Sequence, residues 1–176
     1  MKINIRKESP DDYLSVFNLV ERAFRDEKYS DHQEHFLVER LRASKAFVPG
    51  LSLVYVLEKK IVGYILLTEI NIKNSEDEIG SLALAPVAVL PEFQGKGIGG
   101  ELIEAAHQSA RDLGYQSVVL LGHDKYYPRF GYRLADKFGI SLPFDVPKEN
   151  CMVIELQPNA LKHVHGDVVY PKEFYQ

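Results

Sequence analysis

Stretches of alternating or continuous apolar residues recur along the middle of the chain and predict the strands of a sheet. Residues 51–57 and 61–72 are rich in β-branched and aromatic residues, and the polar segment Glu58-Lys59-Lys60 joins them as a hairpin. Residues 79–89 form the next apolar run after a short polar turn. Three consecutive strands joined by short turns should each run antiparallel to the strand before.

Apolar residues spaced three and four positions apart predict three helices, two before these strands and one after them. The first begins at Ser9-Pro10, with Ser9 as N-cap, and presents one apolar face: Tyr13, Val16, Phe17, Val20, Ala23 and Phe24. The second covers about residues 30–42, with three residues expected to point inward: Phe36, Leu37 and Leu41. The third covers residues 97–113, and its expected inner face is Ile98, Leu102, Ala105, Ala106, Ser109, Ala110 and Leu113.

The remaining apolar runs extend the sheet toward the C-terminus. Residues 117–121 are continuously apolar, and a strand that follows the previous one through a helix should run parallel to it. Residues 150–156 and 166–170 predict two later strands. A chain of 176 residues fits a single domain, 1–176, with a core of about 1–156 and a C-terminal extension of about 157–176.

Pro86 interrupts the third of the antiparallel strands. Proline cannot donate a hydrogen bond to a neighbouring strand and occurs at edges, strand starts and bulges. Because apolar residues surround Pro86, we expect a bulge or a gap in the sheet near Ala85 to Ala88. An extended ligand chain could pair with the backbone groups left free there.

Composition and charge exclude several classes of protein. The net charge of −4 argues against a broad nucleic-acid interface, and no apolar run is long enough for a transmembrane helix. The N-terminal segment lacks the apolar region of a signal peptide. The single cysteine, Cys151, fits a reducing compartment, and no His/Cys cluster has metal-ligand spacing. We therefore expect a cytoplasmic protein without a metal.

Four glycines in six positions mark the start of the third helix. Gly95, Gly97, Gly99 and Gly100 leave this turn without side chains, and Lys96 adds a positive charge. The first N–H groups of a helix lack partners within it and carry partial positive charge. The segment therefore predicts a site for a phosphate or a diphosphate.

The same segment resembles a known coenzyme signature. The pattern Gln94-x-x-Gly97-x-Gly99 after a strand is similar to the acyl-coenzyme A motif of the GNAT superfamily of N-acetyltransferases. The resemblance implies an α+β fold whose mixed, mostly antiparallel sheet is flanked by helices and splayed between its fourth and fifth strands. It also implies that acetyl-coenzyme A binds in that splay, against Val87, Ala88, Val89, Gln94, Gly95, Lys96, Gly97, Ile98, Gly99 and Gly100.

A second motif follows the fifth predicted strand. Residues 122–132 read GHDKYYPRFGY, and Tyr127 to Gly131 followed by Tyr132 resembles the Y-x-x-x-G-F element of the same superfamily. The resemblance implies that Tyr127 lies beside the coenzyme sulfur as a general acid. Because two tyrosines are adjacent, Tyr126 is the alternative for this position.

The resemblance implies transfer of an acetyl group to a primary amine by direct attack, with a small molecule or a peptide as acceptor. The central strand carries Leu82 and Leu84 where many relatives have a carboxylate, so Glu69 on the preceding strand is the expected base. His123 and a water molecule are alternatives. A homodimer is a further expectation, whereas nucleic acid and membranes are not expected partners.

Two other functions fit parts of the pattern. Because no base is evident, the chain could bind acyl-coenzyme A as a sensor or partner module without turnover. Gly95, Gly97 and Gly100 also satisfy the dinucleotide fingerprint GxGxxG, with Asp124 near the expected distance for its acidic residue. The strand-rich, Pro-interrupted residues after Asp124 disfavour the doubly wound sheet that this fingerprint requires.

Overall fold

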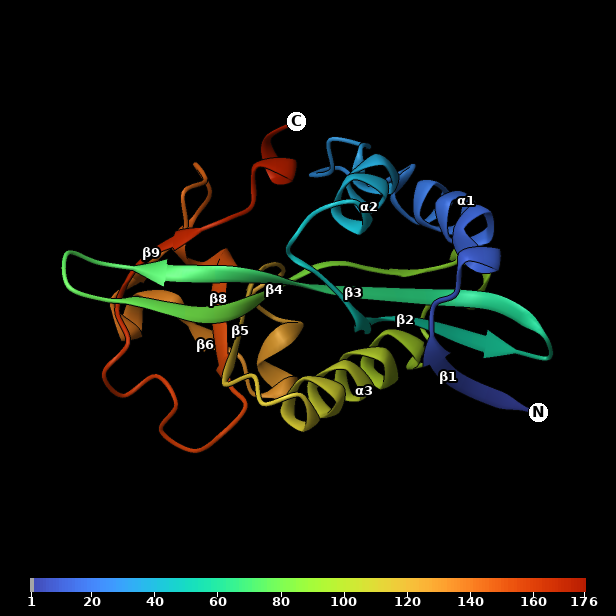
Figure 1. Ribbon diagram of the computed structural model, residues 1–176. Helices are drawn as coiled ribbons and strands as arrows, with labels where there is room; N and C mark the ends of the chain where they lie inside the picture. The colour runs from blue at the N-terminus through green and yellow to red at the C-terminus, as the bar shows by residue number, and fades with distance from the viewer. Residues whose placement is uncertain (1) are drawn as a thin grey trace.

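Three long strands form the centre of the computed structural model, which describes residues 2–176. They are β2 (Phe47–Leu57), β3 (Lys60–Lys73) and β4 (Glu78–Val89), each antiparallel to the next, as predicted (Figure 1). Glu58 and Lys59 alone form the β2–β3 turn, with φ of 48° and 70°. Two positive φ values in a two-residue loop are typical of a type I′ turn, which confirms the hairpin.

The sheet is mixed and mostly antiparallel, as predicted. Its order is β1-β2-β3-β4-β5-β8-β6, and β9 pairs with β3 and with β7. In the described part of the chain only the β4–β5 and β7–β9 pairs are parallel. The shorter strands are β1 (Ile3–Lys7), β5 (Ser117–Leu121), β6 (Arg133–Leu134), β7 (Ile140–Ser141), β8 (Cys151–Glu155) and β9 (Gly166–Val169).

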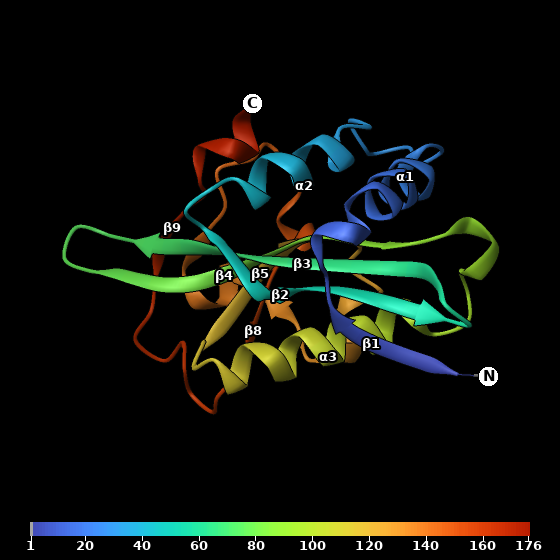
Figure 2. The ribbon, with the colours of Figure 1, turned by 45° about the vertical axis from the view of Figure 1, so that its right-hand side comes forward.

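Helices cover both faces of this sheet. Figures 1 and 2 show α1 (Tyr13–Phe24) and α2 (Glu34–Arg42) on one face and α3 (Ile98–Asp112) on the other. Short 3-10 turns complete the chain: η1 (Pro10–Asp12), η2 (Pro91–Phe93), η3 (Tyr127–Phe130), η4 (Ala135–Phe138), η5 (Lys148–Asn150) and η6 (Lys172–Tyr175). Within residues 2–176, no helix has the length and apolar character needed to cross a membrane.

The expected bulge in β4 is present at Pro86. Ile65 pairs with Val87 and Leu67 with Leu84, so the single residue Leu66 of β3 faces both Ala85 and Pro86. An extra residue on one strand bends that strand and increases its twist. β4 therefore changes direction at the point where the gap was predicted.

β4 and β5 separate beyond this level. Their parallel pairing comprises Leu82 with Val118 and Ala83 with Val119, although β4 continues to Val89. The sheet is thus splayed between its fourth and fifth strands, and the splay opens toward the start of α3.

The C-terminal extension adds a strand to the edge of β3. β9 pairs with residues 71–73 of β3, and Figure 1 shows the last residues returning toward α2. Arg40 Nε of α2 donates to the Glu173 carbonyl at 3.1 Å. The extension therefore connects the far end of β3 to the helical layer above it.

Three residues that were expected to point inward are exposed. Phe36 is 41% exposed, Leu113 53% and Tyr13 37%. Leu113 follows the last residue of α3, so it lies beyond the buried face, and Ile103 and His107 are buried on that helix. Tyr13 lies under the Arg42 guanidinium, 4.0 Å from the ring centroid, rather than in the core.

Candidate active site

Gly95 and Gly97 shape the turn that leads into α3. Their φ angles are 74° and 85°, and Gly97 is the N-cap of the helix. No atom lies within 4 Å of the position that a Cβ would take on either residue. The left-handed backbone therefore requires glycine at both positions, while the space beside them stays open.

Gly99 and Gly100 are glycines for a different reason. A Cβ on Gly99 would lie 3.1 Å from the Tyr126 hydroxyl, and one on Gly100 would lie 3.2 Å from the Phe130 ring. The aromatic segment after β5 thus packs directly onto the first turn of α3. The two sequence motifs meet in space at these glycines.

The first turn of α3 has hydrogen-bond donors for an anion. Its first internal bond joins the Glu101 N–H to the Gly97 carbonyl at 3.0 Å, so the N–H groups of residues 98–100 have no partner in the helix. Ile98 is buried and can contribute only this backbone group. Lys96 Nζ and Lys60 Nζ lie 5.2 and 5.3 Å from the centroid of the Phe93 ring. Lys60 is paired with Glu92 at 3.7 Å, so the free amides and Lys96 are the groups that suit a diphosphate.

Val87 and Val89 present their backbone to the splay. The Leu90 N–H donates to the Val62 carbonyl of β3 at 2.9 Å, and backbone groups alternate sides along a strand. Val87 and Val89 therefore point away from β3, whereas Ala88, paired with Tyr64, points toward it. Gln94 Nε2 donates to the Val89 carbonyl at 3.0 Å, which fixes the turn to the end of β4.

Tyr127 has a buried ring, and its hydroxyl makes no hydrogen bond to another group within residues 2–176. The residue is 7% exposed, and its ring meets those of Tyr126 and Tyr132 edge-on, with centroids 5.0 and 5.7 Å apart. In the described residues, two fully enclosed side-chain atoms lack a hydrogen bond, Glu34 Oε2 and Thr68 Oγ1. The Tyr127 hydroxyl is not one of them, so it is not fully enclosed. Burial raises the pKa of Tyr127. The phenol is therefore protonated at neutral pH and available to a ligand atom.

Tyr126 takes a different position from its neighbour. It is half-buried, with its hydroxyl beside Gly99, and burial raises its pKa. The Arg129 guanidinium lies 4.8 Å from its ring centroid. Tyr126 therefore lies at the anion end of the site rather than deep in the splay.

The end of β5 holds Gly122 and His123. The Gly122 N–H donates to the Asn150 carbonyl at 2.9 Å, and Asn150 Nδ2 donates to the Gly122 carbonyl at 3.0 Å. The His123 carbonyl accepts the Tyr126 N–H at 3.1 Å, and the His123 residue is exposed. These two hydrogen bonds between Gly122 and Asn150 fix the backbone shortly before the tyrosines.

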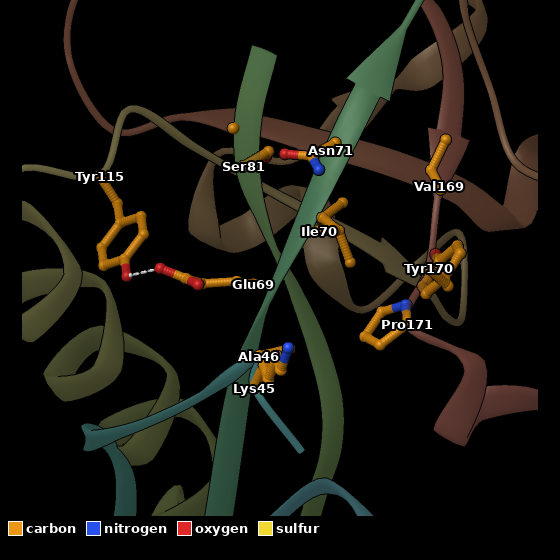
Figure 3. A pocket seen from close by; sticks show the side chains of 11 residues that line it. Lys45, Ala46, Glu69, Ile70, Asn71, Ser81, Tyr115, Val169, Tyr170 and Pro171 are labelled. Atoms are coloured by element: carbon orange, nitrogen blue, oxygen red, sulfur yellow. Dashed lines mark hydrogen bonds between the residues drawn. The ribbon is translucent and has the colours of Figure 1, made fainter. Parts of the chain in front are cut away.

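Glu69 lines a cavity of about 410 Å³ at the edge of β3, between the start of β2 and the end of β9 (Figure 3). The Tyr115 hydroxyl donates to Glu69 Oε1 at 2.5 Å. Burial, with this bond to a carboxylate, raises the pKa of Tyr115 to about 12. Lys45, Asn71, Tyr170 and Pro171 also line the cavity.

Glu69 bonds the residue that precedes β5 by two positions, Tyr115, whereas Tyr127 follows the end of β5. The five residues of β5 span about 17 Å. Glu69 also pairs with Leu82, at the level where β4 and β5 are still hydrogen-bonded. The structure thus brings Tyr126 to Gly99, with the Tyr127 ring beside Tyr126, and it places Glu69 at the level where the splay begins.

Sequence reasoning missed the residues that connect the two motifs. Phe130 packs on Gly100, and Arg129 stacks on Tyr126 and donates from Nε to its carbonyl at 2.9 Å. The aromatic-rich segment suggested packing, but only the fold shows that its partner is the start of α3.

Comparisons with known proteins identify a family for this chain. A family model described as "Acetyltransferase (GNAT) domain" matches residues 50–134. The chain is 40% identical over 130 residues to the uncharacterized N-acetyltransferase YjhQ of Escherichia coli K12, covering 73% of this chain and 69% of YjhQ. It is 28% identical over 170 residues to the uncharacterized N-acetyltransferase YhbS of the same strain, covering 97% of each chain.

Two solved structures are similar over almost the whole chain. The Escherichia coli YhbS complex with CoA has a TM-score of 0.89 at 25% identity and covers 100% of this chain and 93% of YhbS. A GNAT family acetyltransferase from Brucella melitensis in complex with acetyl-CoA has a TM-score of 0.81 at 34% identity, covering 98% of each chain.

Proposed function

This chain belongs to the GNAT family of N-acetyltransferases, and we propose on that basis that it transfers an acetyl group from acetyl-coenzyme A to a primary amine by direct attack. One observation carries the proposal. The glycine turn of α3 and the free edge of β4 border the splay between β4 and β5, and the Tyr127 ring packs against Gly122, directly after β5. The similar structures contain CoA and acetyl-CoA, which supports this choice of coenzyme.

The coenzyme would bind along this splay. Its diphosphate would accept hydrogen bonds from the N–H groups at the start of α3, with Lys96 nearby. Its extended amide chain would pair with the outward-facing backbone of Val87 and with the Val89 N–H. The Val89 carbonyl already accepts a bond from Gln94, so it is the group least available to the coenzyme.

Tyr127 would act at the sulfur. Attack of the amine nitrogen forms the C–N bond, and collapse of the intermediate breaks the C–S bond and releases a thiolate. The raised pKa of Tyr127 makes full proton transfer to the thiolate less favourable than from an ordinary phenol. A hydrogen bond from the hydroxyl to the developing thiolate is therefore the main contribution, with water delivering the final proton.

The acceptor amine would lose its proton without direct help from Glu69. Glu69 is exposed and already accepts a hydrogen bond from the Tyr115 hydroxyl at 2.5 Å. His123 lies at the same end of β5 as Tyr127 but is exposed. We therefore propose that the neutral fraction of the amine attacks, and that the nitrogen of the tetrahedral intermediate then gives its proton to solvent water.

The alternative functions differ in what they require. A dinucleotide enzyme of the doubly wound type needs a mostly parallel sheet, and this sheet has a single parallel pair at its centre. A non-catalytic module for acyl-coenzyme A would use the same splay, so only turnover distinguishes it from an acetyltransferase.

Two measurements test the proposal. Coenzyme A should raise the Tm of the protein, whereas NAD and NADP should leave it unchanged. Free thiol should appear when acetyl-coenzyme A is incubated with a panel of primary amines, at a rate that Tyr127→Phe lowers about 10²-fold. Binding without thiol release across the panel would favour the module, and a Tm response to NADP alone would overturn the proposal.

A further inference from the structure

His107 is a polar residue on the buried face of α3. It is 3% exposed and lies among apolar neighbours on the helix, such as Ile103 and Ala110. Its Nε2 lies 2.7 Å from the Tyr132 hydroxyl, and Tyr132 is 2% exposed. Because both groups are buried away from water, breaking this hydrogen bond would leave two polar atoms unpaired, so the pair should keep its geometry.

Tyr132 in turn supports Tyr127. The two rings meet edge-on, with centroids 5.7 Å apart and an interplanar angle of 78°. On its other sides the Tyr127 ring meets Tyr126 and the backbone at Gly122. With its hydroxyl bonded to α3, the Tyr132 ring cannot swing away from this contact.

We propose that His107 and Tyr132 are positioning residues that hold the Tyr127 phenol at the sulfur end of the splay. The inference rests on the proposed function, in which Tyr127 bonds the developing thiolate. Neither His107 nor Tyr132 is assigned contact with the reacting atoms. Their effect on the reaction passes through the orientation of the Tyr127 ring.

The position of His107 gives this support a specific consequence. The glycine turn lies at the start of α3, and His107 lies further along the same helix. One helix therefore contacts both the expected diphosphate site and Tyr132. The coenzyme diphosphate and the phenol are thereby positioned relative to the same element. Burial lowers the pKa of His107 to about 4, so its ring is neutral at neutral pH and the pair remains a neutral hydrogen bond.

The test compares six variants of the chain in the thiol-release assay, one of which is Tyr127→Phe alone. Tyr132→Phe removes the hydroxyl and leaves the ring. The double substitution His107→Leu with Tyr132→Phe also removes the buried nitrogen that Tyr132→Phe would leave unpaired. Both are then combined with Tyr127→Phe. The control is Tyr64→Phe, which removes another buried hydroxyl, bonded to Ser52 Oγ of β2 at 2.8 Å rather than to α3.

The expected result is a loss of kcat without a loss of coenzyme binding. Tyr132→Phe and the double substitution should lower kcat between about 5- and 100-fold, because misplacement of a reacting group costs rates of this order. The KM for acetyl-coenzyme A should stay within about twofold, since the binding groups are untouched. In the Tyr127→Phe background the same substitutions should have no further effect on kcat.

Each contrary outcome has its own meaning. If Tyr127→Phe lowers kcat but Tyr132→Phe and the double substitution do not, the positioning role is overturned while the proposed function stands. A loss that persists in full in the Tyr127→Phe background, or that Tyr64→Phe reproduces, likewise overturns it. If Tyr127→Phe itself leaves kcat unchanged, the proposed role of Tyr127 is wrong, and the positioning role that rests on it is overturned as well.

Discussion

The Tyr127 ring occupies the space that a side chain on Gly122 would need: a Cβ on Gly122 would lie 2.2 Å from Cε2 of that ring. The two residues are five positions apart, on either side of the turn that follows β5. Because Asn150 fixes the Gly122 backbone from both its N–H and its carbonyl, the glycine cannot move to accommodate a methyl group. The ring would have to move instead.

Gly122→Ala should therefore impair the reaction through Tyr127. We expect a loss of kcat of about 10-fold or more, since a shift of about 1 Å in a reacting group has effects of this size. Overpacking should also lower the free energy of unfolding by about 1–3 kcal/mol. Gly80→Ala is the matched control, because a Cβ on Gly80 meets no atom within 4 Å. Equal kinetics for the two variants would contradict the role of this contact.

Gly97→Ala should weaken coenzyme binding. A left-handed φ of 85° costs an alanine about 1–2 kcal/mol, so the first turn of α3 should rearrange. The rise in Tm produced by coenzyme A should become smaller than for the unmodified protein. Gly114→Ala introduces the same strain at the other end of the helix, where φ is 88°. That control should lower the Tm itself and keep the full coenzyme-induced rise.

The rate of acetyl transfer should follow the ionisation of the acceptor. An alkylamine has a pKa near 10, so without a dedicated base kcat/KM should rise about tenfold per pH unit between about pH 7 and 9. Tyr127 should stay protonated over this range because burial raises its pKa above the usual value. Glu69→Gln should leave the slope unchanged. A plateau that Glu69→Gln removes would show that Glu69 acts as the base after all.

Acidification should destabilise the protein first through His107. Burial lowers the pKa of His107 from 6.5 to about 4, so the unfolded chain binds the proton more readily than the folded one. The stability that the neutral ring supports is present above pH 6.5 and decreases by about 3 kcal/mol as the pH falls toward 4. Urea unfolding of the His107→Leu, Tyr132→Phe variant at each pH should show a flatter profile. A profile that is unchanged by the substitutions would contradict this assignment.

A second loss of stability should follow at lower pH through Asp12. The bidentate bond from Arg6, at 2.7 and 3.0 Å, is the main cause that lowers the Asp12 pKa to about 2. A depressed carboxylate pKa stabilises the fold above the unfolded pKa near 3.8, and this is lost as the pH falls toward 2. The change should be about 2 kcal/mol. Asp12→Asn should remove this part of the pH dependence, and its persistence in that variant would point to other carboxylates.

Much of the architecture could be predicted from local patterns. The hairpin at Glu58, the antiparallel order of β2 to β4 and the parallel β5 follow from apolar runs, turn length and the intervening helix. The bulge at Pro86 follows from the missing N–H of proline. Each of these features depends on residues close together in the sequence, so a single sequence contains the necessary information.

The candidate site could be predicted only in part. The glycine turn and the tyrosine segment were identified from their residues, but their contact at Gly99 and Gly100 joins segments about 30 positions apart. Nothing in either segment indicates that His107 would meet Tyr132, or that Glu69 would meet Tyr115. Such contacts depend on how α3 and β5 pack on the sheet.

By itself the sequence determined which segments become strands, where the sheet is interrupted, and which glycine turn begins the third helix. These properties follow from backbone chemistry within a few residues, where glycine permits positive φ and proline removes a donor. The tertiary structure alone decided which side chains share a cavity and which tyrosine lies buried in the site. Those outcomes depend on the packing of distant elements against one sheet, which brings Tyr126 to Gly99 and His107 to Tyr132 although these residues lie far apart in the sequence.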